Sequence, residues 1–196
     1  EAREKIVEKL NQKGLVVSVD EDYTNFVATA ERSGGTIEPQ IMKQWWIDTE
    51  KEFPFKTDKL SGIEKGQMVT LKEVMLHAVR KDHINILPDR FEKVYMNWIE
   101  NLRPWNISRQ IWFGHQVPVW YKDGEIHVDI KAPEGEGWVR DEDTLDTWFS
   151  SGLWTFSTLG WPHDTDDFRT YHPTQVLETG HDLIFFWVAR MILMTL

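Results

Sequence analysis

Residues 175–191 read QVLETGHDLIFFWVARM, an extended segment that runs through a glycine into an apolar helical pattern. Residues 175–180 are typical of a strand, and the apolar run 183–196 predicts a buried core helix. In open α/β sheets, ligands bind beyond the carboxyl ends of the strands. A glycine there permits close approach, and the following helix N-terminus offers free N–H groups. The stretch therefore predicts an α/β fold with a ligand site at this turn.

Asp182 has two interpretations at that turn. Its carboxylate can accept hydrogen bonds from a pair of ribose hydroxyls. It can also cap the helix and complement the helix dipole, as acidic residues in a first turn often do. The two roles are compatible, and spacing alone does not separate them.

The composition bounds the class of protein. The 196 residues carry a formal net charge of −10, eleven tryptophans and no cysteine. A chain this acidic is not a free-standing nucleic-acid binder, because phosphate contacts require clustered Lys and Arg. The tryptophans indicate flat-walled pockets beside ordinary core packing. Without cysteine there is no disulfide or thiolate zinc site, and the histidines lack metal-ligand spacing, so no metal site is predicted.

The ends of the sequence carry no targeting signal. Residues 1–10 lack the apolar segment of a signal peptide, and residues 183–196 form a 14-residue run that contains Arg190, too short to span a bilayer. We therefore expect a cytoplasmic protein with no membrane partner. The sequence starts within one helical pattern and stops within another, so both ends look cut.

The N-terminal part reads as a small α+β module. Residues 2–13 place apolar side chains on one helical face, and Gly14 follows as a stop signal. Residues 15–19 and 23–30 predict two short strands. The polar residues 48–66 are interpreted as an irregular or lightly ordered segment, and as an insertion.

Two helices and a hairpin are predicted in the middle of the chain. The Thr-x-x-Glu pattern of residues 70–73 is a capping box that begins a helix ending at Arg80. A similar Asp-x-x-Glu box at residues 89–92 begins a second helix, which places Val94 on its buried side and ends before Pro104. Residues 117–130 alternate around a Lys-Asp-Gly turn and predict a hairpin.

The segment TGHDLIFFWVARM (179–191) closely resembles the signature of valyl-tRNA synthetases, which are class I aminoacyl-tRNA synthetases. In that family it opens the second half of the nucleotide-binding fold. The resemblance implies that Gly180 and Asp182 lie against the adenosine of ATP or of the aminoacyl-adenylate. It also implies that Leu183 and Trp187, which share one face of an α-helix, line the amino-acid pocket.

The second match is DEDTLDTWFSSGLWTFSTLGWP (141–162), which is the most specific because it is long and rich in tryptophan. Isoleucyl relatives typically carry an acid in place of Ser150. The resemblance implies that Trp148 is a pocket wall facing the substrate methyl groups, whereas Trp154 and Trp161 are interpreted as core residues. The serine pair lacks the Gly-x-Ser-x-Gly elbow of a hydrolase.

The third match, NISRQIWFGHQVPVWY (106–121), is similar to the segment that returns from the editing insertion of the family. Arg109 has two open roles, stacking on a tRNA base or binding its phosphate, or joining elements through a buried ion pair. Gln110 belongs to the same polar set. His115 is interpreted as a hydrogen-bonded structural residue, because adenylate formation requires positioning and charge stabilisation more than a general base. No catalytic residue is assigned.

Residues 1–16 and 31–47 are similar to the end of the editing insertion and its return strand. The resemblance therefore divides the chain into residues 1–47, an α+β remnant of that insertion, and residues 48–196, part of a Rossmann-like catalytic domain with an insertion at 48–66. The cysteine-bearing metal insert of many relatives is missing between residues 121 and 141. No zinc is predicted.

The resemblance implies a parent enzyme that condenses valine with ATP, accompanied by Mg²⁺, to valyl-adenylate and then charges tRNA(Val) as a monomer. The His-Ile-Gly-His and Lys-Met-Ser-Lys-Ser type loops of class I are not among the 196 residues, so the isolated chain is expected to be inactive. Two alternatives remain open. One is an isoleucyl- or leucyl-type synthetase fragment, and the other is a non-catalytic nucleotide- or protein-binding domain derived from the fold.

Overall fold

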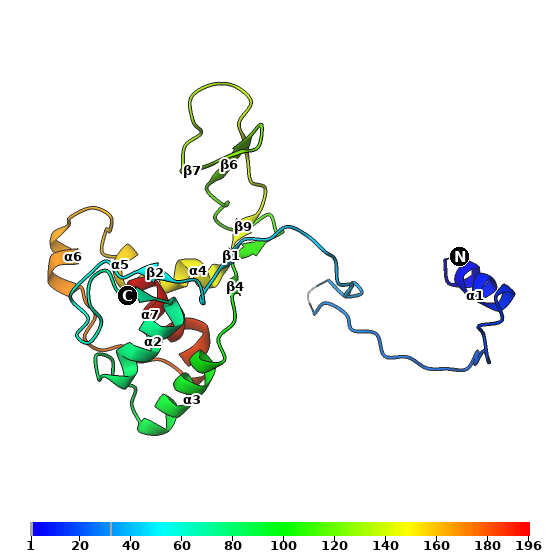
Figure 1. The fold of residues 1–196 in the computed structure, drawn as a ribbon, viewed down its shortest axis with the longest axis horizontal. Helices are drawn as coiled ribbons and strands as arrows, with labels where there is room; N and C mark the ends of the chain where they lie inside the picture. The colour runs from blue at the N-terminus through cyan, green and yellow to red at the C-terminus, as the bar shows by residue number, and fades with distance from the viewer. Residues whose placement is uncertain (1, 32) are drawn as a thin grey trace. The chain divides into compact units, whose positions relative to one another are not determined.

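The computed structural model describes residues 2–31 and 33–196, and the chain divides into two compact units at Met42 and Lys43 (Figure 1). Arg32, which belongs to the segment similar to the return from the editing insertion, lies outside the described residues. Each unit is described by itself. The assignment of residues 1–47 to an editing insertion stays a prediction.

The first unit consists of α1 (Ala2–Gln12) and a long irregular segment. The helix is confirmed, and Gly14 follows it with a φ of 66°, a conformation that favours glycine. The strands predicted at 15–19 and 23–30 are wrong, since the only pairing there is a bridge between Thr29 and Thr36 within the described residues. A strand needs a backbone partner and a face to bury, and most apolar side chains of both segments are exposed.

The strands of the second unit form small antiparallel ladders. The pairs are β1 (Trp46–Ile47) with β4 (Trp105–Asn106), β2 (Phe53–Pro54) with β3 (Met68–Val69), β5 (Ser108–Arg109) with β9 (Thr144–Leu145), and β6 (Val119–Lys122) between β7 (Glu125–Val128) and β8 (Val139–Arg140). The predicted hairpin is confirmed in β6 and β7. Its turn residues Asp123 and Gly124 have φ of 48° and 87°, as a two-residue hairpin loop requires.

Residues 175–180 were predicted as a strand, and this prediction is wrong for the chain by itself. The segment has no regular secondary structure and pairs with no strand among the described residues. Val176 at its centre is 83% exposed. The residue pattern is that of a strand, but the backbone partner that would define one is not among residues 2–31 and 33–196.

The described part of this unit also contains six α-helices of 4 to 12 residues. They are α2 (Leu71–Arg80), α3 (Asp89–Glu100), α4 (Thr147–Gly152), α5 (Trp154–Ser157), α6 (Asp166–Tyr171) and α7 (Ala189–Thr195). None of the described helices is long and apolar enough to cross a membrane.

The first predicted capping box is confirmed, and the second is wrong. Thr70 Oγ1 accepts from the Glu73 backbone N–H at 3.1 Å, and Glu73 Oε2 accepts from the Thr70 N–H at 2.7 Å. At α3, Pro88 occupies the N-cap position, so no side chain caps that helix, and Asp89 and Glu92 lie in its first turn. The proline displaces the expected cap by one residue.

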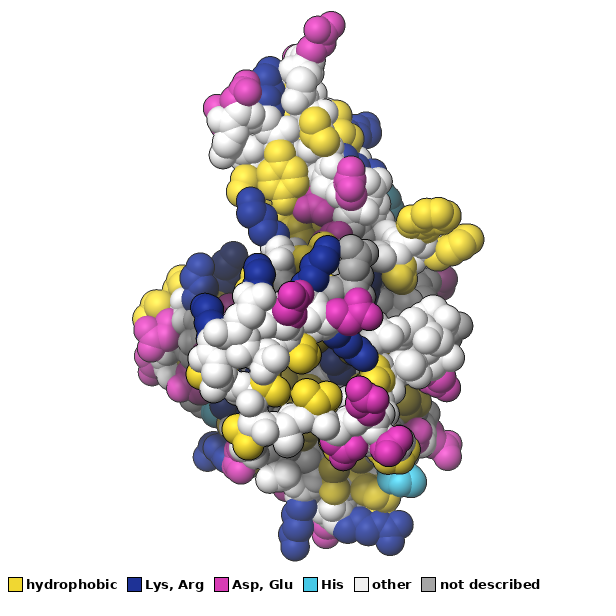
Figure 2. Space-filling view, turned by 90° about the vertical axis from the view of Figure 1, so that its right-hand side faces the viewer, with side chains coloured by type: hydrophobic (Ala, Val, Ile, Leu, Met, Phe, Trp, Pro, Cys, Tyr) yellow, Lys and Arg dark blue, Asp and Glu magenta, His cyan; other side chains and the backbone are white. Residues whose placement is uncertain are grey.

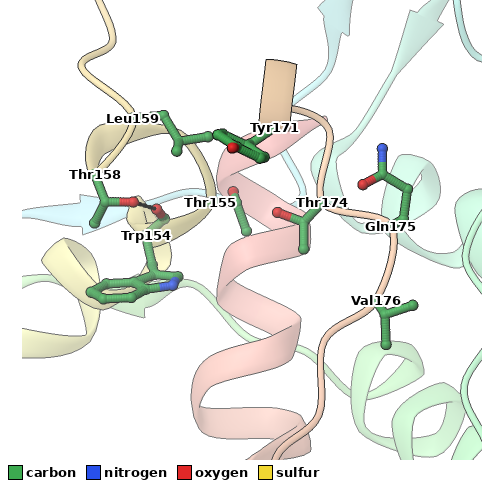
Figure 3. A pocket seen from close by; sticks show the side chains of 8 residues that line it. All are labelled: Trp154, Thr155, Thr158, Leu159, Tyr171, Thr174, Gln175 and Val176. Atoms are coloured by element: carbon green, nitrogen blue, oxygen red, sulfur yellow. Dashed lines mark hydrogen bonds between the residues drawn. The ribbon is translucent and has the colours of Figure 1, made fainter. Parts of the chain in front are cut away.

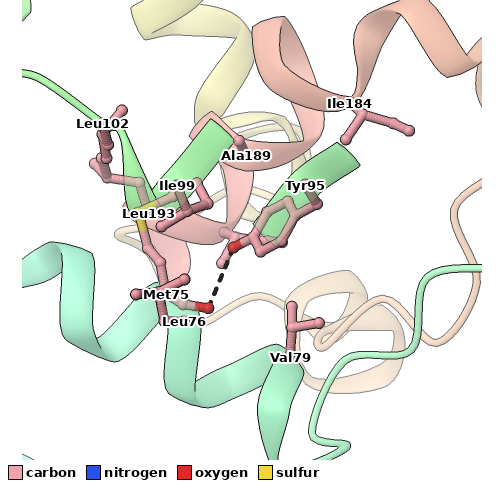
Figure 4. Packing of buried hydrophobic residues seen from close by; sticks show 10 residues of the cluster. Met75, Leu76, Val79, Tyr95, Ile99, Leu102, Ile184, Ala189 and Leu193 are labelled. Atoms are coloured by element: carbon pink, nitrogen blue, oxygen red, sulfur yellow. Dashed lines mark hydrogen bonds between the residues drawn. The ribbon is translucent and has the colours of Figure 1, made fainter. Parts of the chain in front are cut away.

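The main hydrophobic core lies where α2, α3 and the C-terminal helical segment meet (Figure 4). Tyr95 and Ile99 on α3 are fully buried, and the Tyr95 hydroxyl donates to the Met75 carbonyl at 3.2 Å. Val94, which the apolar pattern placed on the buried side, is 43% exposed. The core members are Met75, Leu76, Val79, Tyr95, Ile99, Leu102, Ile184, Ala189, Ile192 and Leu193.

Residues 48–66 are irregular apart from β2, which agrees with the first of the two predicted alternatives, whereas light order does not describe them. Phe55, Leu60 and Ile63 are buried in a second cluster that also contains Val69 and Val74 of the following elements. Only a few apolar residues interrupt this polar stretch, and each of them fills the cluster. The segment is therefore anchored against the start of α2.

The capping box makes a stability prediction. Thr70→Ala removes the hydroxyl that accepts the Glu73 N–H, and we expect the free energy of unfolding to fall by about 1 kcal/mol. Urea denaturation measures this change. Thr158→Ala is the control, because its hydroxyl only donates to the Trp154 carbonyl at an exposed site. Equal midpoints for the two variants would contradict the assignment of the cap.

Candidate functional site

The helix predicted after Gly180 is wound in three ways. It begins as the 3₁₀ turn η1 (His181–Leu183), widens into the π-turn η2 (Ile184–Val188) and continues as α7. Single π-turns inside helices often mark functional sites. The α-helical spacing assumed for Leu183 and Trp187 is therefore wrong, because Leu183 lies in the tighter 3₁₀ turn and Trp187 lies in the wider π-turn. Their roles in binding stay predictions.

The two tryptophan-bearing motifs meet between α4 and η2. The Trp148 ring stacks on Phe186 with centroids 5.8 Å apart and planes inclined by 16°. The Trp187 indole N–H donates to the Ser151 carbonyl at 2.9 Å. Gly152 permits this approach, since a Cβ there would lie 3.3 Å from the Arg190 carbonyl oxygen. Residues 141–162 and 179–191 thus form one interlocked surface.

Gly180 and Asp182 lie against each other at the start of the helical segment. A Cβ on Gly180 would come within 2.5 Å of Asp182 Oδ1, so the carboxylate lies over the glycine backbone. The Asp182 side chain is exposed and makes no capping hydrogen bond at this N-terminus. The predicted capping hydrogen bond is therefore not made, but Asp182 lies in the first turn, where its charge complements the helix dipole, and its carboxylate is exposed.

The polar set of the third motif makes contacts within the protein. Arg109 pairs with Asp146 at 3.0 Å, which supports the ion-pair role. Gln110 donates to Asp143 at 3.0 Å, and His115 Nδ1 lies 3.1 Å from the Ser150 hydroxyl. These contacts favour structural roles. Figure 2 shows acidic and basic side chains interspersed on the face that it presents.

A buried polar cluster beside these residues was not found from the sequence. Asp146 is the N-cap of α4 and accepts from the Trp148 backbone N–H at 3.3 Å. It also accepts from the Trp105 indole N–H at 3.1 Å, and the Arg190 guanidinium lies 4.5 Å from the centre of the Trp105 ring. Two features of the sequence could have indicated this cluster. Asp146 directly precedes the helix that starts at Thr147, and Arg190 lies inside the apolar run 183–196.

Two cavities of similar size lie in the second unit, and neither is lined by the predicted site residues Gly180, Asp182, Leu183, Trp148 or Trp187. One, of about 490 Å³, is uncharged and lies between α5 and residues 174–176 (Figure 3). The other, of about 450 Å³, borders the Arg190 side of the cluster described above.

A hydrogen-bonded junction lies next to this region. The Tyr121 hydroxyl donates to Asp141 Oδ2 at 2.6 Å, and the Trp45 indole N–H donates to the same oxygen at 2.8 Å. Burial, followed by the neighbouring Asp141 carboxylate, raises the pKa of Tyr121 to about 12. Burial also acts to raise the pKa of Asp141, but the hydrogen bonds from Tyr121 and Trp45 outweigh it and lower that pKa.

This junction predicts a pH dependence. The pKa of Tyr121 is higher in the folded than in the unfolded chain, so its contribution is complete below about pH 10 and is lost as the pH rises towards 12. We expect the free energy of unfolding to fall over that interval, and Tyr121→Phe to reduce the fall. Tyr95, whose pKa burial also raises, contributes in both proteins. Urea titrations at pH 9 and 11 measure the difference. Tyr23→Phe, at an exposed position, is the control.

The chain belongs to the class I tRNA synthetase family. The family described as "tRNA synthetases class I (I, L, M and V)" matches residues 3–139 and 125–196. The chain is 45% identical to the valine–tRNA ligase of Bacillus licheniformis over 197 residues. This match covers 98% of the chain and 20% of the relative. The chain is 46% identical to the valine–tRNA ligase of Streptococcus pyogenes serotype M3 over 198 residues. This match covers 100% of the chain and 20% of the relative.

The valine–tRNA ligase of Bacillus subtilis (strain 168) is 44% identical over 197 residues, again 98% of this chain and 20% of the relative. The chain spans about a fifth of the length of these curated relatives.

Among its described residues, no group of three or more His, Cys, Asp or Glu side chains is arranged to hold a metal ion.

Proposed function

We propose that this chain is part of a valine–tRNA ligase and supplies one wall of its amino-acid and adenylate site. The observation that carries the proposal is the 44–46% identity to valine–tRNA ligases along nearly the whole chain. In the proposed reaction, valine and ATP give valyl-adenylate and pyrophosphate. The acyl group then passes to the 3′ end of tRNA(Val), and AMP leaves.

The proposed amino-acid pocket uses Trp148, Leu183 and Trp187. The contact of Trp148 with Phe186 and the hydrogen bond from Trp187 to Ser151 support this role, because they bring the two motifs to one surface. Flat apolar walls exclude longer side chains, but they do not strongly reject an isostere that replaces a methyl with a hydroxyl. An editing activity in the parent enzyme, to which residues 1–47 would belong, is the proposed remedy.

The proposed adenosine contact uses Gly180 and Asp182. The glycine leaves room at the turn, and the exposed Asp182 carboxylate has no capping bond to give up before it accepts hydrogen bonds from ribose hydroxyls. ATP is a substrate here, with Mg²⁺ carried by its phosphates. Residues 175–180 would join a Rossmann-like sheet of the larger catalytic domain, which would supply the backbone partner that a strand needs.

The close contact at the turn gives a specific prediction. Gly180→Ala places a Cβ against Asp182 Oδ1, so the carboxylate must swing away from its present position. In the whole enzyme we expect the KM for ATP to rise about tenfold, because one charged hydrogen bond to the ribose is lost. The KM for valine is expected to stay unchanged. Pyrophosphate-exchange kinetics measure both constants. The control is Gly35→Ala, where the new Cβ meets only Ser33 Oγ at 3.4 Å.

Amino-acid-dependent pyrophosphate exchange by the whole enzyme tests the proposed function. Valine, isoleucine, leucine and methionine are compared, since the family includes all four specificities. We expect kcat/KM for valine to exceed that for isoleucine by about 100-fold, the size of discrimination that one methylene permits. Preference for another of the four would replace the valyl assignment. Binding of a valyl-adenylate analogue without exchange would favour a non-catalytic nucleotide-binding domain. The isolated chain is expected to show no exchange.

A further inference from the structure

The π-turn leaves a backbone carbonyl that one arginine side chain satisfies. The Ala189 N–H bonds to the Ile184 carbonyl, five residues back, so it does not reach the Phe185 carbonyl that an α-helix would give it. The Arg190 Nη1 donates to the Phe185 carbonyl at 2.8 Å and to the Phe186 carbonyl at 2.9 Å. Arg190 therefore stabilises the wide turn that carries Phe186 and Trp187.

The same guanidinium reaches the cap of α4 through one aromatic ring. It lies 4.5 Å from the centre of the Trp105 ring, at cation–π distance. The Trp105 indole donates to Asp146, and Asp146 in turn caps α4 at Trp148. We call Arg190, Trp105 and Asp146 the Arg190 cluster. It links the backbone of η2 to the backbone of α4.

The Arg190 cluster is not arranged for the greatest stability. Arg190 Nε is buried and has no hydrogen-bond partner among the described residues, which is a cost. Burial lowers the pKa of Arg190, the charge of Asp146 opposes this, and Arg109 adds to it. Arg109 forms the ion pair with the buried Asp146 carboxylate, whereas Arg190 contacts Asp146 only through the ring of Trp105. A charge kept at such a cost is better explained by the geometry it imposes than by the free energy it contributes.

We propose that Arg190 is a positioning residue whose cluster fixes the placement of Trp148 relative to Trp187, and thereby the width of the valine pocket. This inference rests on the proposed function for its consequence in catalysis. Its structural part stands on the contacts alone. No substrate contact by Arg190 is involved.

The structural part is tested in the chain itself by hydrogen exchange of the tryptophan indole N–H groups. Arg190→Met keeps the length of the apolar stem and removes the donors and the charge. We expect the Trp187 indole, bonded to the Ser151 carbonyl, to exchange about tenfold faster than in the parent chain, because its bond then opens more often. The Trp120 indole, bonded to the Asp129 carbonyl in the hairpin, is the matched control and keeps its rate. Unchanged protection of Trp187 overturns the inference.

The catalytic part is tested in the whole enzyme by separating KM from kcat. For Arg190→Met we expect the KM for valine to rise about tenfold, the preference for valine over isoleucine to fall, and the KM for ATP to stay within about twofold. Arg190→Lys keeps a cation near Trp105, so its KM for valine is expected to lie between that of the parent enzyme and that of Arg190→Met. A residue with only a structural role would lower the amount of active enzyme and leave both KM values unchanged.

The two proposals fail separately. If the parent enzyme uses valine but Arg190→Met keeps its valine KM within about twofold, the inference is wrong and the proposed function stands. If the parent enzyme does not use valine but the Trp187 indole loses protection in Arg190→Met, the proposed function is wrong and the positioning role of Arg190 stands.

Discussion

Replacing Trp148 with alanine in the whole enzyme is expected to lower kcat/KM for valine by about 100-fold and to bring isoleucine close to valine as a substrate. An indole supplies a large flat apolar surface, and its loss opens the pocket by far more than the one methylene that separates the two amino acids. That methylene accounts for only about 1 to 3 kcal/mol of discrimination in a well-fitted pocket. Pyrophosphate exchange with each amino acid measures the effect.

Trp154→Ala is the matched control for this change. Trp154 belongs to the same motif, but its interpretation as a core residue is wrong, because it is 55% exposed beside the uncharged cavity (Figure 3). We therefore expect no change in the preference for valine. Trp187→Ala is expected to resemble Trp148→Ala, since the two rings belong to the same interlocked surface. If valine selection survives both Trp148→Ala and Trp187→Ala, the pocket assignment is incorrect.

Ile99→Ala is expected to have the largest effect on stability, lowering the free energy of unfolding by about 2 to 5 kcal/mol. Ile99 is fully buried on α3 where this helix meets α2 and the C-terminal helical segment (Figure 4). Removing its side chain leaves a cavity in a close-packed interior, which adds to the lost burial. Such a loss is a large fraction of the roughly 5 to 15 kcal/mol that stabilises a typical domain.

Val94→Ala, on the same helix, is the control for Ile99→Ala. Val94 is 43% exposed, so we expect its truncation to change the free energy of unfolding by less than about 1 kcal/mol. Urea denaturation of the three proteins measures both values. Equal losses for the two variants would show that this core does not hold α3 in place.

Features set by neighbouring residues could be predicted from the sequence. The capping box at Thr70 and Glu73 needs only a spacing of three, and the hairpin turn at Asp123 and Gly124 needs only two residues that accept positive φ. The box predicted at Asp89 was wrong because a proline one residue earlier took the cap position. Local rules succeed where the competing candidates are few.

Features that depend on distant partners could not be predicted. Residues 175–180 have the pattern of a strand, but a strand exists only with a partner, and none of the described residues provides one. The cluster of Trp105, Asp146 and Arg190 joins residues 41 and more positions apart, so no spacing rule identifies it. The π-turn likewise has no recognisable local signal. The candidate residues came from family resemblance, and the contacts between their motifs came from the fold.

We propose that α4 and the π-turn form the wall that recognises valine. A crystal structure of the whole enzyme with a non-hydrolysable valyl-adenylate analogue tests it most directly. We expect the isopropyl group to contact the rings of Trp148 and Trp187, and the Asp182 carboxylate to lie within hydrogen-bond distance of the ribose hydroxyls. An isopropyl group that contacts neither ring, or a ribose held away from Asp182, would contradict it.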